Sequence, residues 1–245
     1  AWIVPLLAGL MAYKAEHRIF RIGAAVLFAV TLLAVFLGQS RFALAGIVLA
    51  LSLMIQLLIQ RWRWRLAAWG GIALLIILEV MIIRNVFSPN RLSTQIDRDE
   101  LSASLRLGMW QQAINIMGDL PLTGVGLNQF RDNRVRALYP VPGYETRVLP
   151  HTHNELLQIG TDLGIPGLVI YISWYGVIGL MLIRCFRYGT ETVKVLAVAT
   201  GGALLAHTVF GLGDAIPIWD RFAFVGWWVI ALAGSTKTRY DLNKA

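Results

Sequence analysis

Long apolar runs separated by short polar segments are the main pattern along this chain. Each run comes close to the roughly 20 residues that an α-helix needs to cross a bilayer. The run from Gly164 to Ile183 contains no charged residue. The pattern therefore predicts an all-α, polytopic transmembrane helical bundle. The predicted spans cover residues 20–37, 42–60, 67–86, 164–183, 195–213 and 215–234.

A shorter apolar stretch, Trp2 to Ala12, precedes these spans and cannot cross a bilayer by itself. The chain begins with Ala1 rather than Met, and the stretch lacks the basic residues that open a signal peptide. We therefore expect it to be part of a helix that starts before this sequence.

Basic residues divide the connections between the spans into two sets. One set contains every lysine of the chain, together with arginines around positions 18–21, 61–65 and 184–187. Because positive charge accumulates in cytoplasmic loops, we place this set in the cytoplasm. The long segment at 87–163 then lies outside, between membrane parts at 1–86 and 164–245.

Composition agrees with a membrane protein. Hydrophobic residues make up 57% of the chain and charged residues 15%, which is less charge than a soluble domain usually carries. The net charge of +8 would suggest nucleic-acid binding in a soluble protein. Here the charge follows from the basic loops, so we expect a lipid bilayer and no nucleic acid as partner. The single cysteine, Cys185, excludes an intrachain disulfide.

The external segment is long for a loop, and loops of this length usually fold and have a function. Asp99 can cap a helix that starts near Glu100, and Gly118 would end it. A turn at 124–126 and a second short helix over 127–138 are expected to follow. The first helix carries an apolar stripe at three- and four-residue spacing: Ala103, Leu107, Trp110, Ile114 and Met117.

Apart from its histidines, the external segment has only arginine as a basic residue. Arginine presents a planar, permanently charged fork that suits phosphate oxygens, so the segment could hold a lipid-linked phosphate or diphosphate. The alternative is that individual arginines pair with carboxylates such as Asp132 and Glu145. Arg106 stands out because it lies four residues before Trp110 and borders the apolar stripe. Arg41, in the tight external turn 38–41, stands out as well. The arginines of the segment are Arg91, Arg98, Arg106, Arg131, Arg134, Arg136 and Arg147.

Two histidines, His151 and His153, stand just before an apolar-containing run. If a helix begins near His153, its N-terminal dipole disfavours an imidazolium, and a neutral imidazole can act as a general base. Two alternatives stay open. The histidines could bind zinc with Glu155 or Asp162, or His153 could be purely structural. No third ligand stands at a spacing that favours zinc, so we expect no metal site.

Ionisable residues also occur within the predicted spans, namely Glu79 and His207. Such residues are costly in a bilayer and are functional candidates by default. They leave open a transporter, or a non-catalytic component of a polysaccharide export system. A transporter more often shows internal repeats and broken helices around a midplane site, and the sequence shows neither.

Several motifs occur together between residues 38 and 183. His153-Asn154 is followed after nine residues by Gly164-x-x-Gly167, and Ser104-Leu105-Arg106 with Trp110 precedes Pro121 and Gly124-x-Gly126. Gln39-Ser40-Arg41 forms the external turn. Together these motifs resemble the O-antigen ligase family. The chain departs from the family in having fewer spans, and in having Ala45 where some members have leucine.

This resemblance implies a glycosyltransferase that works without metal or cofactor at the periplasmic side of the bacterial inner (plasma) membrane. The donor would be a glycan on undecaprenyl diphosphate. His153 would take the proton of the acceptor hydroxyl, while Arg41 and Arg106 would hold the diphosphate. The acceptor would be lipid A–core or a similar glycolipid, another glycan or a protein, so ligase, polymerase and O-oligosaccharyltransferase activities all stay open. Further substrate contacts would come from Asn154, Arg131, Arg134, His151 and Trp110.

Overall fold

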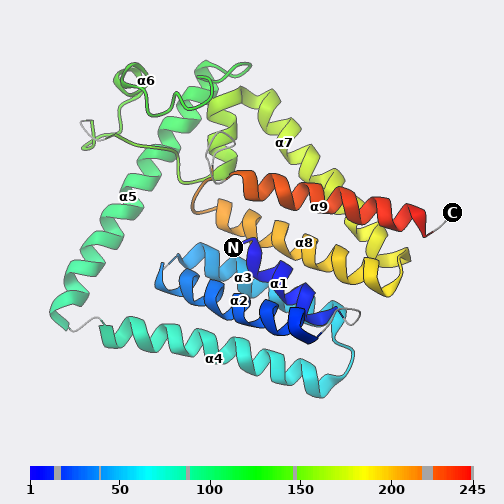
Figure 1. Cartoon of the computed structure of the whole chain (residues 1–245). Coiled ribbons are helices and arrows are strands. Elements are labelled where there is room, and N and C mark those ends of the chain that lie inside the picture. The colour runs from blue at the N-terminus through cyan, green and yellow to red at the C-terminus, as the bar shows by residue number, and fades with distance from the viewer. Residues whose placement is uncertain (14–17, 39, 87–88, 146–147, 217–222, 244–245) are drawn as a thin grey trace. The chain divides into compact units, whose positions relative to one another are not determined.

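The computed structural model describes residues 1–13, 18–38, 40–86, 89–145, 148–216 and 223–243, with only the backbone described at 75, 78–86 and 89–102. The described chain is helical and contains no strand (Figure 1). Within the described residues, four helices are long and apolar enough to cross a membrane. The prediction of an all-α polytopic membrane protein is therefore confirmed. The helices are α1 (Ile3–Ala12), α2 (Arg18–Leu37), α3 (Arg41–Leu58), α4 (Trp62–Val86), α5 (Pro89–Asp119), α6 (Asn133–Leu138), α7 (Glu155–Tyr188), α8 (Glu191–Gly211) and α9 (Ala223–Leu242).

The predicted spans correspond to helices, with changed ends. The four membrane-length helices are α2, α3, α7 and α8, and the third predicted span lies within α4. The last span was predicted to start at residue 215, which is wrong. The backbone at Ala215 and Ile216 is not helical, because its N–H groups donate to carboxylates instead of continuing a helix. The described part of α9 starts at Ala223.

The chain divides into two compact units. The first unit comprises residues 1–74, 174–210 and 222–245. Its helices approach closely where one of them carries glycine. A Cβ at Gly46 in α3 would lie 2.4 Å from the Ala206 carbonyl oxygen of α8, and one at Gly9 in α1 would lie 2.3 Å from Ala199 Cβ. Small residues at such contacts let backbones pack tightly where no hydrophobic effect drives association.

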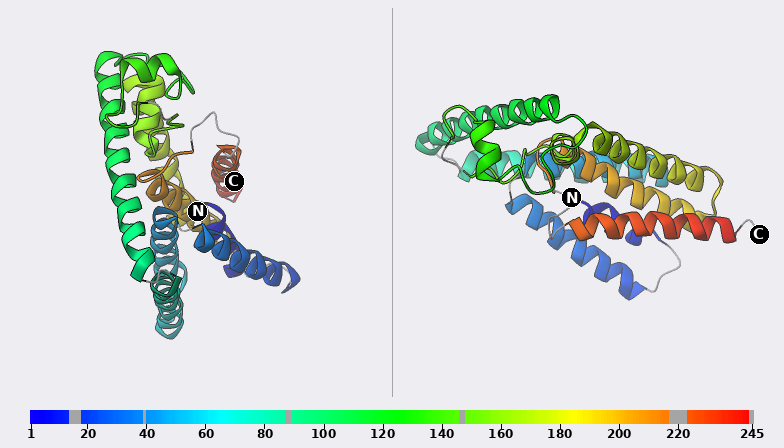
Figure 2. Two further views of the ribbon diagram at one scale, coloured as in Figure 1. Left: turned by 90° about the vertical axis from the view of Figure 1, so that its left-hand side faces the viewer. Right: turned by 90° about the horizontal axis from the view of Figure 1, so that it is seen from above.

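The second unit comprises residues 75–173 and 211–221, and it contains the segment predicted to be external. The connecting loop, α6 and the start of α7 gather at the C-terminal end of α5 (Figure 2). An apolar core holds them together. Its buried members are Met109, Ile116, Phe130, Val141 and Leu149. The part of this segment that follows residue 104 therefore has an apolar core of its own.

Three local predictions in this segment need correction. The first helix starts at Pro89, not near Glu100, because proline suits the first turn of a helix, where its missing N–H is not needed. The second helix covers only α6, since Asn128 has a positive φ of 64° and Asp132 caps the helix through the Arg134 N–H at 2.8 Å.

The predicted apolar stripe of α5 was also partly wrong. Leu107 and Ile114 are exposed, while Met109 and Ile116 form the buried face. Apolar residues also occur outside the predicted stripe, at Met109 and Ile116 among others, so spacing alone does not identify the buried face. The loop after α5 decides it by packing Phe130 and Val141 against Met109 and Ile116.

Candidate functional site

Thr152 anchors the histidine segment of the second unit. The residue is fully buried. Its backbone N–H donates to Gln158 Oε1 at 2.9 Å, and its carbonyl oxygen accepts from Trp110 Nε1 at 3.0 Å. Its hydroxyl donates to the Asn154 carbonyl oxygen at 2.8 Å. Three hydrogen bonds to α5, α7 and the following turn therefore fix the backbone between the two histidines.

Asn154 forms the cap of α7. Its side-chain Oδ1 accepts from the Leu157 N–H at 3.1 Å, and its carbonyl oxygen accepts from Gln158 N at 2.9 Å. This is the usual arrangement of an N-cap residue. The helix thus starts at Glu155, close to the start near His153 that the sequence suggests. His153 precedes it with a φ of 52°, a left-handed conformation that is uncommon outside glycine.

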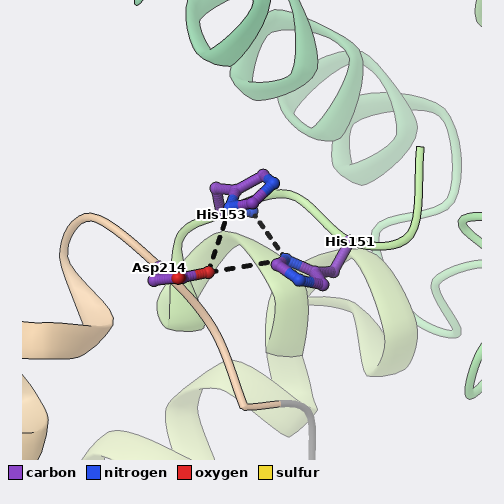
Figure 3. A group of neighbouring side chains, drawn as sticks. All are labelled: His151, His153 and Asp214. Carbon is purple, nitrogen blue, oxygen red and sulfur yellow. Dashed lines mark hydrogen bonds and ion pairs between the residues drawn. The ribbon is translucent and has the colours of Figure 1, made fainter. Parts of the chain in front are cut away.

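A carboxylate from a distant turn meets both histidines (Figure 3). His153 Nδ1 lies 3.0 Å from Asp214 Oδ1, and His151 Nδ1 lies 3.9 Å from the same oxygen. The His153 backbone N–H donates to His151 Nδ1 at 3.2 Å, so that nitrogen is an acceptor. Because an ionised carboxylate only accepts, the pair requires His153 to donate from Nδ1. A neutral His153 then keeps a lone pair on Nε2, which is what a general base needs.

Glu155 holds the turn that carries Asp214. Its carboxylate is buried, and Oε2 accepts from the Ile216 N–H at 2.9 Å. The turn contacts the same segment a second time, because Asn154 Nδ2 donates to the Leu212 carbonyl oxygen at 3.2 Å. These bonds join the start of α7 to residues 212–216, so both partners of the His153–Asp214 pair are held by the same few residues.

Asp214 is ionised at neutral pH in this setting. Burial alone would raise the pKa of its carboxyl group. The hydrogen bonds from His153 and from the Ala215 N–H, together with the two imidazoles, outweigh burial and lower that pKa below its ordinary value. The carboxylate can therefore stabilise a protonated His153.

The segment with Gly124 and Gly126 forms backbone hydrogen bonds with α7 just before Gly164. Gly164 interrupts α7 with φ 69° and ψ −173°, which frees the preceding carbonyl groups. The Thr161 oxygen accepts from Val125 N at 2.9 Å, and the Asp162 oxygen accepts from Gly126 N at 3.0 Å. A Cβ at Gly124 would lie 2.4 Å from the Thr161 oxygen. Both Gly124 and Gly126 have a positive φ, and the missing side chain at Gly124 lets this segment approach the break in α7.

Comparison with known proteins places these motifs in a family. A model of the O-antigen ligase family matches residues 25–172, more than half of the chain. The chain belongs to the O-antigen ligase family. Relatives include a protein of Rickettsia bellii named "Putative polysaccharide ligase", 31% identical over 144 residues that cover 58% of this chain and 33% of the relative. A similarly named protein of Rickettsia typhi is 25% identical over 162 residues, 61% of this chain and 35% of the relative. The matched part of this chain thus spans about a third of each relative's length.

The family match includes the predicted residues of the second unit but ends before Asp214. Trp110 contacts the histidine segment through its ring N–H, which makes it a support of that segment. Arg106 lies one turn earlier on α5, and residues four apart share a helix face. Both side chains are half-buried. Arg106 therefore lies on the same face of α5 as Trp110.

The other predicted arginines are placed differently in this O-antigen ligase family chain. Arg131 and Arg134 are exposed on either side of Asp132, the cap of α6. Arg41 is the first residue of α3, which Ser40 caps through the Ala43 N–H at 3.3 Å. Arg41 lies in the first unit and His153 in the second. That these residues meet in one site stays a prediction, as do the substrate contacts of Asn154, Arg131, Arg134 and His151.

Sequence reasoning missed Asp214, although a signal was present. A carboxylate in a short turn between two apolar runs is costly near a bilayer unless it has a partner. The acidic residues weighed earlier as zinc ligands point elsewhere: Glu155 binds Ile216 N, and Asp162 accepts from Gln158 Nε2 at 2.9 Å. His207 is buried against Trp2, with ring centroids 4.2 Å apart. The side chain of Glu79 lies outside the described residues.

Proposed function

We propose that this chain forms the catalytic part of a glycosyltransferase of the O-antigen ligase type. It would transfer a glycan from undecaprenyl diphosphate to an acceptor hydroxyl at the periplasmic side of the bacterial inner membrane, without a metal. The observation that carries the proposal is the His153–Asp214 pair, 3.0 Å between Nδ1 and Oδ1, at the start of a helix. The family membership supports the glycan as the transferred group.

His153 acts as the general base in this proposal. Its Nε2 takes the proton of the acceptor hydroxyl while the oxygen attacks the anomeric carbon of the donor sugar. The bond from that carbon to the diphosphate oxygen breaks, and undecaprenyl diphosphate leaves. Asp214 fixes the tautomer of His153 and stabilises the imidazolium that forms, a role that depends on the 3.0 Å contact.

Arginine side chains neutralise the leaving diphosphate. Arg106 is the first choice because it shares the face of α5 with Trp110, whose N–H binds the carbonyl oxygen of Thr152, beside His153. Arg41 is the second residue proposed, at the start of α3. Arg131 and Arg134 are lesser candidates on the exposed surface. A guanidinium binds phosphate oxygens in a bidentate way and keeps its charge at any working pH.

The acceptor is proposed to be lipid A–core or a similar glycolipid, which makes the protein a ligase. Polymerisation of a glycan, or transfer to a protein hydroxyl, would use the same base and the same leaving group. The periplasmic placement of residues 87–163 rests on the lysine-containing connections, which we assign to the cytoplasm. Apolar side chains of the spans would accommodate the polyprenyl tail.

Transfer of a labelled glycan in membranes that contain the protein tests this proposal. We expect His153→Ala to lower the rate about 100- to 10,000-fold, the usual contribution of a general base. Arg106→Ala should lower it as well, with partial recovery in Arg106→Lys. His17→Gln and Arg239→Ala are matched controls from other segments of the chain and should retain the rate.

Full transfer by purified, folded His153→Ala and Arg106→Ala proteins would contradict the proposed site. A transporter predicts another result. Proteoliposomes with the unmodified protein would then take up a glycan substrate and form no transfer product. The Glu79→Gln variant would abolish this uptake. The intact protein should be used for both measurements, since the matched part of this chain spans about a third of its curated relatives.

A further inference from the structure

His151 takes no proton in the proposed transfer step, yet it lies beside His153 and Asp214, which carry that step. Three potential ligand atoms lie within 4.8 Å of one another, one each from His151, His153 and Asp214. Figure 3 shows the three side chains converging. The three side chains keep 20%, 29% and 36% of their surface exposed, so a solute can reach them. The three side chains therefore form an accessible group of potential metal ligands.

The spacing of the cluster suits a small tetrahedral ion. Zinc binds imidazole nitrogen and carboxylate oxygen at about 2.0–2.2 Å, so two ligands of a tetrahedral site lie roughly 3.4 Å apart. The Asp214 oxygen lies 3.0 Å from His153 Nδ1 and 3.9 Å from His151 Nδ1, on either side of that value. Two imidazoles and one carboxylate are ligands that zinc accepts, with a fourth position open to water.

We propose that His151, His153 and Asp214 form a zinc-binding site whose occupation inhibits the protein. The binding stands on the geometry alone, whereas the inhibition rests on the proposed function. A zinc ion replaces the hydrogen bond from His153 Nδ1 to Asp214 and also the bond from the His153 backbone N–H to His151 Nδ1. A neutral imidazole bound through Nδ1 carries its proton on Nε2. The lone pair that would accept the proton of the acceptor hydroxyl is then absent, and Asp214 no longer supports an imidazolium.

Calorimetric titration of the detergent-solubilised protein with Zn²⁺ tests the binding, with an affinity tag that lacks histidine. We expect one ion for each chain. His151→Gln and Asp214→Asn should each weaken binding at least about tenfold, because even residues outside the metal shell change affinity 10- to 100-fold. His17→Gln is the matched control and should bind as the unmodified protein does. Mg²⁺, which prefers an octahedral shell of oxygen ligands, should not compete.

The labelled-glycan assay tests the inhibition. Zn²⁺ should lower transfer by the unmodified protein over the same concentration range as it binds, and a chelator should restore the rate. Equal Zn²⁺ binding by the unmodified protein and by His151→Gln would overturn the site. Should that variant fail to fold, displacement of Zn²⁺ by an equal concentration of Mg²⁺ on the unmodified protein would overturn it too. Stoichiometric binding without loss of transfer would overturn the inhibition. Binding with no transfer under any condition would contradict the proposed function and leave the site intact.

Discussion

The two halves of α7 differ in what their side chains do. Before Gly164, the helix buries polar groups: Glu155, Gln158, Thr161 and Asp162 are each at most 5% exposed. After it, large apolar side chains are exposed, as at Ile170 with 68% and Val177 with 64%. The first half uses its polar groups inside the protein, while the second presents the surface that a lipid-facing helix has. Gly164 therefore separates a first part of α7 with buried polar groups, next to the candidate site, from a second part whose exposed apolar surface suits a bilayer.

The largest effect on the transfer rate should come from removing the hydrogen bond between His153 and the Asp214 carboxylate. In Asp214→Asn, the amide can donate to His153 Nδ1 as readily as it can accept from it, so the tautomer with a free Nε2 is no longer fixed. We expect transfer to fall at least about 100-fold, within the range of general-base contributions. The rate of labelled-glycan transfer under saturating donor measures this.

A matched aspartate tests whether charge alone matters. Asp241 pairs with Lys237 on the exposed surface of α9, and Asp241→Asn should keep the rate of the unmodified protein. Asp214→Glu retains the carboxylate and should recover part of the loss. An unchanged rate in Asp214→Asn would remove Asp214 from the proposed mechanism.

A second prediction, with an effect of intermediate size, concerns Gly164, where the two parts of α7 meet. Gly164 has a backbone conformation that almost only glycine adopts, and a Cβ there would lie 2.6 Å from the Pro121 carbonyl oxygen. Gly164→Ala should therefore cost about 1–3 kcal/mol and lower the unfolding midpoint in detergent. It should also lower transfer, because the backbone hydrogen bonds that join residues 125–126 to α7, close to the histidine segment, would weaken.

Gly176, in the second half of the same helix, is the matched control. A Cβ at this position would meet nothing within 4 Å, and alanine favours a helix over glycine. Gly176→Ala should not destabilise the protein. Equal unfolding midpoints for the two variants would show that Gly164 is not a required break.

The same contrast explains what the sequence could predict. Apolar runs identify spans because each helix satisfies its own backbone, so α2, α3 and α8 follow from composition alone. The buried face of α5 does not, since it depends on where Phe130 and Val141 pack. Pro89 at the helix start was a usable signal, because proline is common at that position.

The candidate site divides in a similar way. His153 and Asn154 follow from a local motif, and the structure explains the motif through a cap and a glycine break. Asp214 lies 61 residues away from His153. The turn that carries it meets the motif only because Glu155 and Asn154 bind the backbone of residues 212–216. A partner set by tertiary contacts cannot be found from spacing along one segment.

The smallest effect should come from the first residue of the polar half. Asn154 caps α7, so Asn154→Ala should cost about 0.5–2 kcal/mol of stability, the usual loss at an N-cap. Serine also accepts from the helix N–H groups, so Asn154→Ser should recover the capping part of this loss, while the bond from Asn154 Nδ2 to the Leu212 carbonyl oxygen is still removed. Asp132→Ala removes the matched cap of α6 and should show a loss of similar size.

Kinetics of the serine variant separate a capping role from substrate binding. If Asn154 acts only as a cap, Asn154→Ser keeps both kcat and KM of the unmodified protein, because serine retains the cap of α7 and Glu155 still binds the turn that carries Asp214 through the Ile216 N–H. A KM raised several-fold at an unchanged unfolding midpoint would instead assign the Asn154 amide to the substrate. In that case the bond from Asn154 Nδ2 to the Leu212 carbonyl oxygen has to open when substrate binds. The polar half of α7 would then contact the glycan directly as well as supporting the base.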